Sequence, residues 1–150
     1  MIVLPKNDHE WRALAGFLQQ HAGVHPSADL RVMGWVSEGK LVIAVGLNGF
    51  LGKLAQIHIA FERNWHFSPR AMLEEVFRYA FIEMGREMLL GVVNSNNTKA
   101  MRWDQHLGFR ELYRLPGMHD DGGDVVLLAM KKDECRYLTR RPLLEKTGSE

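Results

Sequence analysis

The spacing of apolar and polar residues along the chain predicts three helices, at about residues 8–20, 69–85 and 97–106. In the first two, apolar side chains recur at i, i+3, i+4 and i+7, which places them on one helical face. Ser68 is in N-cap position for the second helix, and Pro69 follows where its missing N–H costs nothing. Each amphipathic helix therefore has one face to bury against another element.

Shorter apolar runs, rich in β-branched residues, predict six strands between and after these helices. Glu38-Gly39 and Asn48-Gly49 are turn signals that follow the first and the second of them. The strands are expected at about residues 31–37, 40–47, 53–61, 87–93, 109–115 and 124–131, and a further strand before the first helix stays open.

The order of these elements predicts the fold class. A helix joins the strands at 53–61 and 87–93, so these two strands are expected to be parallel. Helices that interrupt a mixed sheet indicate an α/β (α+β) fold, a mixed twisted sheet with helices on both faces. We expect one domain over residues 1–138, followed by a polar C-terminal tail at 139–150.

Composition and charge narrow the class of protein without indicating an activity. The chain has 150 residues, the size of one domain, and its net charge of +1 argues against a dedicated nucleic-acid binder. Its one cysteine, Cys135, cannot form an internal disulfide and suits a reducing compartment. No run approaches the roughly 18 apolar residues that span a membrane, so we expect a soluble, cytoplasmic protein. The histidines and acidic residues match no known metal motif, and no metal is predicted.

Two features of the chain carry candidate chemistry. The loop after the strand at 53–61 leads into a helix N-terminus, whose free N–H groups can hold a pyrophosphate, although an ordinary strand–helix connection explains the same pattern. On the strand itself, alternation puts Gln56, His58 and Ala60 on one face, where His58 is the one titratable group. Histidine suits proton abstraction from an ammonium substrate, and a purely structural histidine is the alternative.

The stretch 94–109 gives a sharper signal. After a strand it reads Asn-x-x-Ala at the start of a short helix, and Leu-Gly-Phe at 107–109 leads into the next strand. This order resembles the C-terminal half of the GNAT superfamily of acyltransferases, and the resemblance covers about residues 30–137. It looks most similar to small GNAT-like proteins of bacteriophage and prophage genomes. In this family the central parallel strands splay apart around the pantetheine arm of the cofactor, so the resemblance implies a splayed central pair here.

The resemblance also implies which residues bind the cofactor, acetyl-CoA or another acyl-CoA. They come from the end of the strand at 53–61, from the loop and helix start that follow, and from the stretch 94–103. Among them, Asn97 is expected to bond a pantetheine amide. The residues are Ile59, Ala60, Phe61, Trp65, His66, Phe67, Ser68, Arg70, Asn94, Asn97, Ala100 and Trp103.

Two departures from the family pattern affect the expected chemistry. The loop 62–70 has no glycine, although the family carries a glycine-rich run there. Asp104 stands where many members have a tyrosine that protonates the departing thiolate, and an ionised carboxylate is a poor proton donor. We therefore assign His58 as the base, on the strand face expected to line the cleft. Tyr113 is assigned as the substitute acid, with departure of CoA assisted by water as the alternative. Glu62 and Glu111 are further base candidates.

The resemblance predicts an enzyme that moves an acetyl or other acyl group from acyl-CoA to a primary amine of an unidentified acceptor. The alternative is a non-catalytic binding protein on the same scaffold, of phage origin, that acts on a host or virion protein. Acyl-CoA and an acceptor amine or protein are the expected partners, with no membrane and no nucleic acid, and a homodimer stays open. A phage-encoded protein of this kind would work in the host cytoplasm.

Overall fold

The computed structural model describes residues 1–65 and 67–138. Within them, seven strands form one sheet in the order β1-β2-β3-β4-β5-β7-β6. In this sheet β4 and β5 are parallel, and the other neighbouring pairs are antiparallel, which confirms the predicted mixed sheet. The strands are β1 (Ile2–Val3), β2 (Arg31–Ser37), β3 (Lys40–Leu51), β4 (Leu54–Phe61), β5 (Met88–Asn94), β6 (Arg110–Leu115) and β7 (Val125–Lys131).

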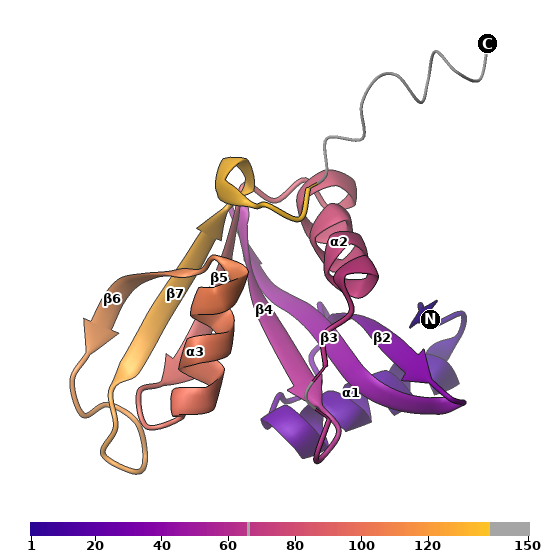
Figure 1. Cartoon of the computed structure of the whole chain (residues 1–150), viewed down its shortest axis with the longest axis horizontal. Coiled ribbons are helices and arrows are strands. Elements are labelled where there is room, and N and C mark those ends of the chain that lie inside the picture. The colour runs from indigo at the N-terminus through magenta and orange to yellow at the C-terminus, as the bar shows by residue number, and fades with distance from the viewer. Residues whose placement is uncertain (66, 139–150) are drawn as a thin grey trace.

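Helices cover both faces of this sheet, as predicted (Figure 1). α1 packs on β2, β3 and β4 on one face, while α2 and α3 lie on the other. A π-helical turn, Tyr79–Glu83, continues α2, and a 3₁₀ turn, Lys132–Glu134, follows β7. The α-helices of the described residues are α1 (Asp8–Ala22), α2 (Arg70–Arg78) and α3 (Thr98–Leu107).

Two apolar clusters, one on each face, hold these layers together. On the α1 face, Leu18 packs in a cluster with Ala44 of β3 and Ala60 of β4. On the opposite face, α2 buries Phe77 against the sheet, and Tyr137 stacks on the Phe77 ring with centroids 5.4 Å apart. Full burial of a side chain as large as leucine or phenylalanine contributes about 1.5–3 kcal/mol. These contacts therefore fix α1 and α2 on opposite faces of β3 and β4.

Gly46 of β3 allows α1 to pack closely on the sheet. A Cβ at this position would lie 2.9 Å from Leu18 Cδ1 and 3.0 Å from Leu30 Cδ1. Gly46→Val is therefore expected to overpack this face and to lower the free energy of unfolding by about 1–3 kcal/mol, measured by urea denaturation. Gly16→Ala is the control, because an added Cβ at this exposed helical position meets nothing within 4 Å. A Gly46→Val protein as stable as the wild type would contradict this packing.

The strand expected at residues 40–47 is longer than predicted. β3 continues through Asn48 and Gly49 to Leu51, so the turn predicted at Asn48-Gly49 was wrong. Gly49 has a φ of 59°, and the register between β3 and β4 shifts between Asn48 and Leu51. Glycine accepts positive φ without steric cost, so the segment forms a bulge inside the strand instead of a turn. As a result Asn48 stays in the sheet, opposite Gln56 of β4.

The helix boundaries lie close to the predicted ones, with one shift at α2. Its first residue is Arg70, so Pro69 is its N-cap, and Ser68, the predicted cap, precedes the helix. No helix of the described residues is long and apolar enough to cross a membrane. The tail predicted at 139–150 lies outside the described residues.

Candidate functional site at the split between two parallel strands

β4 and β5 separate after a short junction, and Figure 1 shows the two strands diverging beyond it. Past the junction, β4 continues over residues 57–61 and β5 over residues 91–94 without pairing to each other. The predicted splayed parallel pair is therefore confirmed, and the space between these two segments is called the split below. The residue pairs of the junction are Leu54 with Met88, Ala55 with Leu89, and Gln56 with Leu90.

His58 lies on β4 two residues beyond the last paired residue, Gln56. Its partner on β3 is Gly46, and residues paired across neighbouring strands point to the same face of the sheet. A Cβ on Gly46 would point at α1, so His58 lies on the face of the sheet that carries α1, together with Ala60. The predicted alternation along β4 is confirmed, but the expectation that this whole face lines an open cleft was wrong, because α1 covers it at Ala60 and buries that residue, whereas His58 is only half-buried. Burial lowers the pKa of His58 below its ordinary value, which favours the neutral imidazole.

Asn48 of β3 holds the His58 imidazole in one tautomer. His58 Nε2 lies 2.7 Å from Asn48 Oδ1. An amide oxygen can only accept, so Nε2 donates and Nδ1 keeps its lone pair. The bulge beside Asn48 is itself anchored, since the Gly49 N–H donates to Asp29 Oδ2 at 2.8 Å. Sequence reasoning missed Asn48 because a turn was predicted there, and no signal in the sequence connects it with His58.

Helix α3 lies across the split and contacts both diverging strands. The Trp103 ring meets the Phe61 ring of β4 edge-on, with centroids 5.0 Å apart. Asp104, the next residue, places Oδ2 3.7 Å from the position that a Cβ on Gly91 of β5 would occupy. Burial raises the pKa of the Asp104 carboxyl to about 7. A carboxyl with this pKa is partly protonated at neutral pH, in contrast to the ionised carboxylate expected from the residue type.

The loop between β4 and α2 carries several of the residues expected to bind acyl-CoA. Trp65 packs against the core cluster, and its Nε1 donates to the Phe67 carbonyl. The Phe67 side chain is exposed. Glu62, one of the further base candidates, forms an ion pair with Lys40 of β3 at 3.3 Å. His66 lies outside the described residues.

The N-terminus of α2 differs from those of the other two helices. Asn7 and Asn97 cap α1 and α3 through their side chains, whereas Pro69 makes no such bond to α2. The first turn of α2 has no acidic residue, and Arg70 forms an ion pair with Glu74 at 3.5 Å. The partial positive charge of this helix end is therefore not offset by an acidic side chain in the first turn and can attract an anion.

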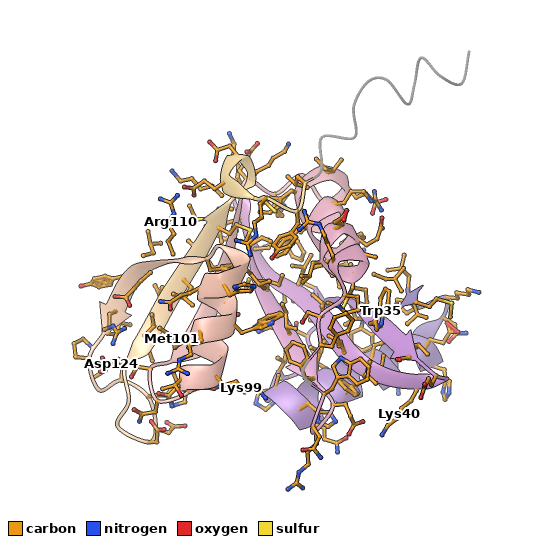
Figure 2. All side chains as sticks on the ribbon, viewed as in Figure 1. Trp35, Lys40, Lys99, Met101, Arg110 and Asp124 are labelled. Carbon is orange, nitrogen blue, oxygen red and sulfur yellow. The ribbon has the colours of Figure 1, made fainter. Side chains whose placement is uncertain are left out.

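Asn94 and Asn97, two of the expected ligand-binding residues, border the turn between β5 and α3, and both have structural partners. Asn97 Oδ1 accepts the Ala100 N–H at 3.1 Å, which leaves Nδ2 as the atom able to bond a ligand carbonyl. Asn94 Nδ2 donates to Asp121 Oδ2 at 2.9 Å and so fastens this turn to the loop between β6 and β7. Asp124 closes the same loop, at the lower left of Figure 2.

Tyr113 is not brought to the split. It lies on β6, the edge strand, and β7 separates β6 from β5. Its side chain is 57% exposed, so it faces solvent instead of the other candidate residues. The structure thus assembles His58, Asp104 and the residues around α2 and α3, but leaves out the tyrosine assigned as the acid.

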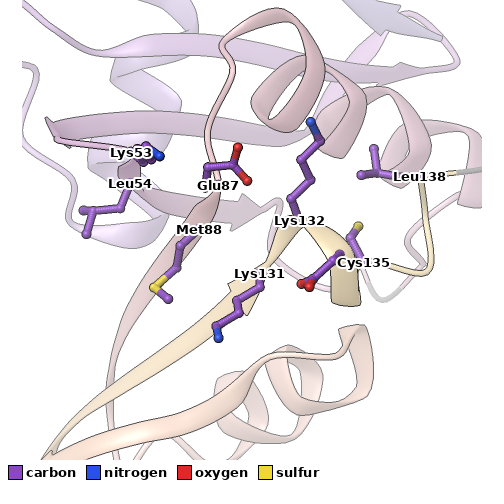
Figure 3. A pocket seen from close by; sticks show the side chains of 9 residues that line it. Lys53, Leu54, Glu87, Met88, Lys131, Lys132, Cys135 and Leu138 are labelled. Carbon is purple, nitrogen blue, oxygen red and sulfur yellow. The ribbon is translucent and has the colours of Figure 1, made fainter.

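A separate cavity of about 700 Å³ opens at the other end of the β4–β5 pair, where the two strands are still joined (Figure 3). Side chains of both charge signs line it, including Lys53, Glu87 and Lys131. Cys135 also lines it, and burial raises the pKa of this thiol. Among the described residues, no three histidine, cysteine, aspartate or glutamate side chains come together to hold a metal ion.

Comparison with solved structures identifies the fold as that of the GNAT N-acetyltransferases. The chain is similar to the spermidine N-acetyltransferase of Vibrio cholerae in complex with CoA and spermine, with a TM-score of 0.70, 14% identity, and coverage of 93% of this chain and 98% of that chain. It is also similar to the ribosomal-protein-S18-alanine N-acetyltransferase of Escherichia coli, with a TM-score of 0.67, 18% identity, and coverage of 87% and 92%. No protein-family model matches the sequence, and no curated protein matches it significantly.

Proposed function

We propose that this protein is an N-acyltransferase that moves an acetyl or other acyl group from acyl-CoA to a primary amine. The observation that carries the proposal is the split between β4 and β5, with the neutral His58 just beyond the junction. Proteins of the same fold act on amines, since one acetylates spermidine and another the alanine of ribosomal protein S18. Fold alone does not fix function, so the proposal also depends on the chemistry of the residues at the split.

Acyl-CoA fits the split as a substrate. Beyond Gln56, the edge of β4 that faces β5 has no strand partner. The amides of a pantetheine arm can pair with such an edge as an added strand would. The pyrophosphate would then meet the open N-terminus of α2, with Arg70 beside it. Asn97 Nδ2 and the Trp103 ring would contact the arm from the α3 side.

His58 supplies the base in this proposal. The amine nitrogen attacks the thioester carbonyl carbon, and Nδ1 of His58 takes the proton of that nitrogen, directly or through one water. Asn48 favours this by keeping the other proton on Nε2. A backbone N–H near Ala60 or Phe61 would polarise the carbonyl oxygen, as the donors of an oxyanion hole do.

Calorimetry of the purified protein with acetyl-CoA tests the proposal. Saturable binding is expected for acetyl-CoA and for CoA, because both carry the pantetheine arm and the pyrophosphate. ADP, which lacks the arm, is the matched control and is expected to bind at least about tenfold more weakly, a difference of about 1.4 kcal/mol. Absence of heat with all three ligands would contradict acyl transfer.

That negative result would favour a second function, a non-catalytic binding protein on the same scaffold, of phage origin and directed at a host or virion protein. The observation behind it is the β4–α2 loop, because residues 62–70 contain no glycine that would let the backbone approach a phosphate closely.

The proposal includes a setting for the reaction. We place the protein in the cytoplasm, and in the host cytoplasm if a phage encodes it. Its free, buried Cys135 is compatible with a reducing compartment. A homodimer is part of the proposal, and light scattering on a sizing column tests it. A solved spermidine N-acetyltransferase of the same fold is dodecameric.

A further inference from the structure

We propose that Asp104 is the general acid of this site, the group that protonates the sulfur as CoA departs, and this role rests on the acyl transfer proposed above. The assignment starts from where α3 places the carboxyl. Trp103 contacts β4 and Asp104 lies against β5, so two consecutive residues meet the two strands that border the split. Asp104 therefore lies at the split itself.

The space next to the carboxyl is open. Gly91 is the first β5 residue beyond the junction. Among the described residues outside its own chain neighbours, Asp104 Oδ2 is the one heavy atom that a Cβ on Gly91 would meet within 4 Å. A glycine at this position leaves room between β5 and α3, and the carboxyl borders that room. A ligand atom that enters the split there would come within reach of Asp104.

Asp104 and His58 approach the split from opposite faces of the sheet. His58 is on the face that α1 covers, and α3 lies on the face that α2 covers. Along the strands, His58 is two residues and Gly91 one residue beyond the junction, so both groups lie at nearly the same level. A thioester held between the strands would have a proton acceptor on one side and a proton donor on the other.

The surroundings of Asp104 favour its protonated form. β5 has no titratable side chain, and the one titratable side chain of β4, His58, is on the opposite face. The charged or titratable groups of α3 are Lys99, Arg102 and His106, and Arg136 donates to the carbonyl of His106. Burial, not a charged neighbour, is the cause that raises the pKa of Asp104 to about 7. A carboxylic acid of this kind can donate a proton at neutral pH.

The step balances without another reactant. The amine nitrogen bonds to the carbonyl carbon while His58 Nδ1 takes the proton of that nitrogen. The electron pair on the carbonyl oxygen then re-forms the double bond, and the carbon–sulfur bond breaks. The sulfur keeps the bonding pair and takes the proton of Asp104, which leaves CoA thiol and an Asp104 carboxylate. Solvent returns a proton to Asp104 and removes one from His58.

The pH dependence of Asp104→Asn tests the role directly. The amide has nearly the shape of the carboxyl but cannot supply the proton, so turnover of a primary amine such as spermidine is expected to fall about 10²–10⁴-fold. The ratio of wild-type to variant rates should be constant below about pH 7, the pKa of Asp104. Above it, the ratio should fall by about tenfold per pH unit. Taking the ratio cancels the titration of the amine and of His58.

The assay measures release of CoA thiol, with the exposed Asp120→Asn as control.

A second measurement does not depend on turnover. The pKa of Asp104 in the folded protein, about 7, lies above the unfolded value near 3.9, so stability is lost as pH rises between these values. The melting temperature of the wild type should therefore fall more between pH 5 and 8 than that of Asp104→Asn. An equal fall in both proteins, or a rate ratio that does not vary with pH, would overturn the assignment and leave the acyl transfer intact. A wild type that binds no acyl-CoA would instead overturn the proposed function, and the acid role with it.

Discussion

Replacing His58 by glutamine is expected to lower the turnover of acyl transfer by about 10²–10⁴-fold and to leave the Kd for acyl-CoA unchanged. The amide can still bond Asn48 across the 2.7 Å contact, so β3 and β4 keep their arrangement. It cannot accept the proton of the attacking nitrogen. Single-turnover kinetics at saturating acyl-CoA, together with calorimetry of acyl-CoA binding, separate the loss of chemistry from a loss of binding.

The pH dependence of the wild type sharpens this prediction. Burial lowers the pKa of His58, so the base becomes protonated, and activity is lost, only at a pH below the ordinary histidine value of about 6.5. This loss of activity at low pH is called the acid limb below, and the His58→Gln protein should not show it. The exposed His9→Gln is the control and should keep both the rate and the limb. If His58→Gln acylates an amine at the wild-type rate between pH 6 and 8, the histidine is structural and the base lies elsewhere.

Asn48→Asp is expected to move the same acid limb upward by about one to three pH units. A carboxylate at this position accepts the Nε2 proton as the amide oxygen does, but its charge stabilises the imidazolium and raises the pKa of His58. At pH values below both limbs the rate should then fall by about tenfold for each pH unit of the shift, while the rate well above the new limb stays close to that of the wild type. Rate–pH profiles of both proteins with one amine give the comparison.

The charge itself needs a control in this experiment. Gln20→Glu adds the same charge at an exposed position of α1, and it should leave the limb where it is. An Asn48→Asp profile that overlays the wild type would show that the side chain at 48 does not tune His58.

Most of the fold could be predicted because local patterns specify it. The helical stripe around Leu18, the glycine after α3 and the β-α-β connection between β4 and β5 each depend on residues close together in sequence. The β3 boundary could not be predicted in this way. Asn48-Gly49 favours a turn by local preference, and pairing with β4 overrides that preference and makes a bulge.

The site was predicted less completely, since its chemistry depends on tertiary contacts. Alternation correctly grouped His58 with Ala60 but could not show that α1 covers their face. Residue type alone gives Asp104 an ordinary acidic pKa, and its burial becomes visible only when α3 is placed on β5. Tyr113 has suitable chemistry, yet the strand order puts it on the far side of β7.

The short junction of β4 and β5 also means that few backbone hydrogen bonds join the two halves of the sheet. On one side of the split β4 pairs with β3, and on the other β5 pairs with β7. Between the two sides, the backbone of the described residues pairs only at residues 54–56 of β4, so a small change in the angle between the sides would strain few other backbone hydrogen bonds. Amide protons on the two sides should therefore exchange with solvent as separate cooperative units. A ligand that pairs with the free edge of β4 would join these units and slow exchange on both sides of the split together.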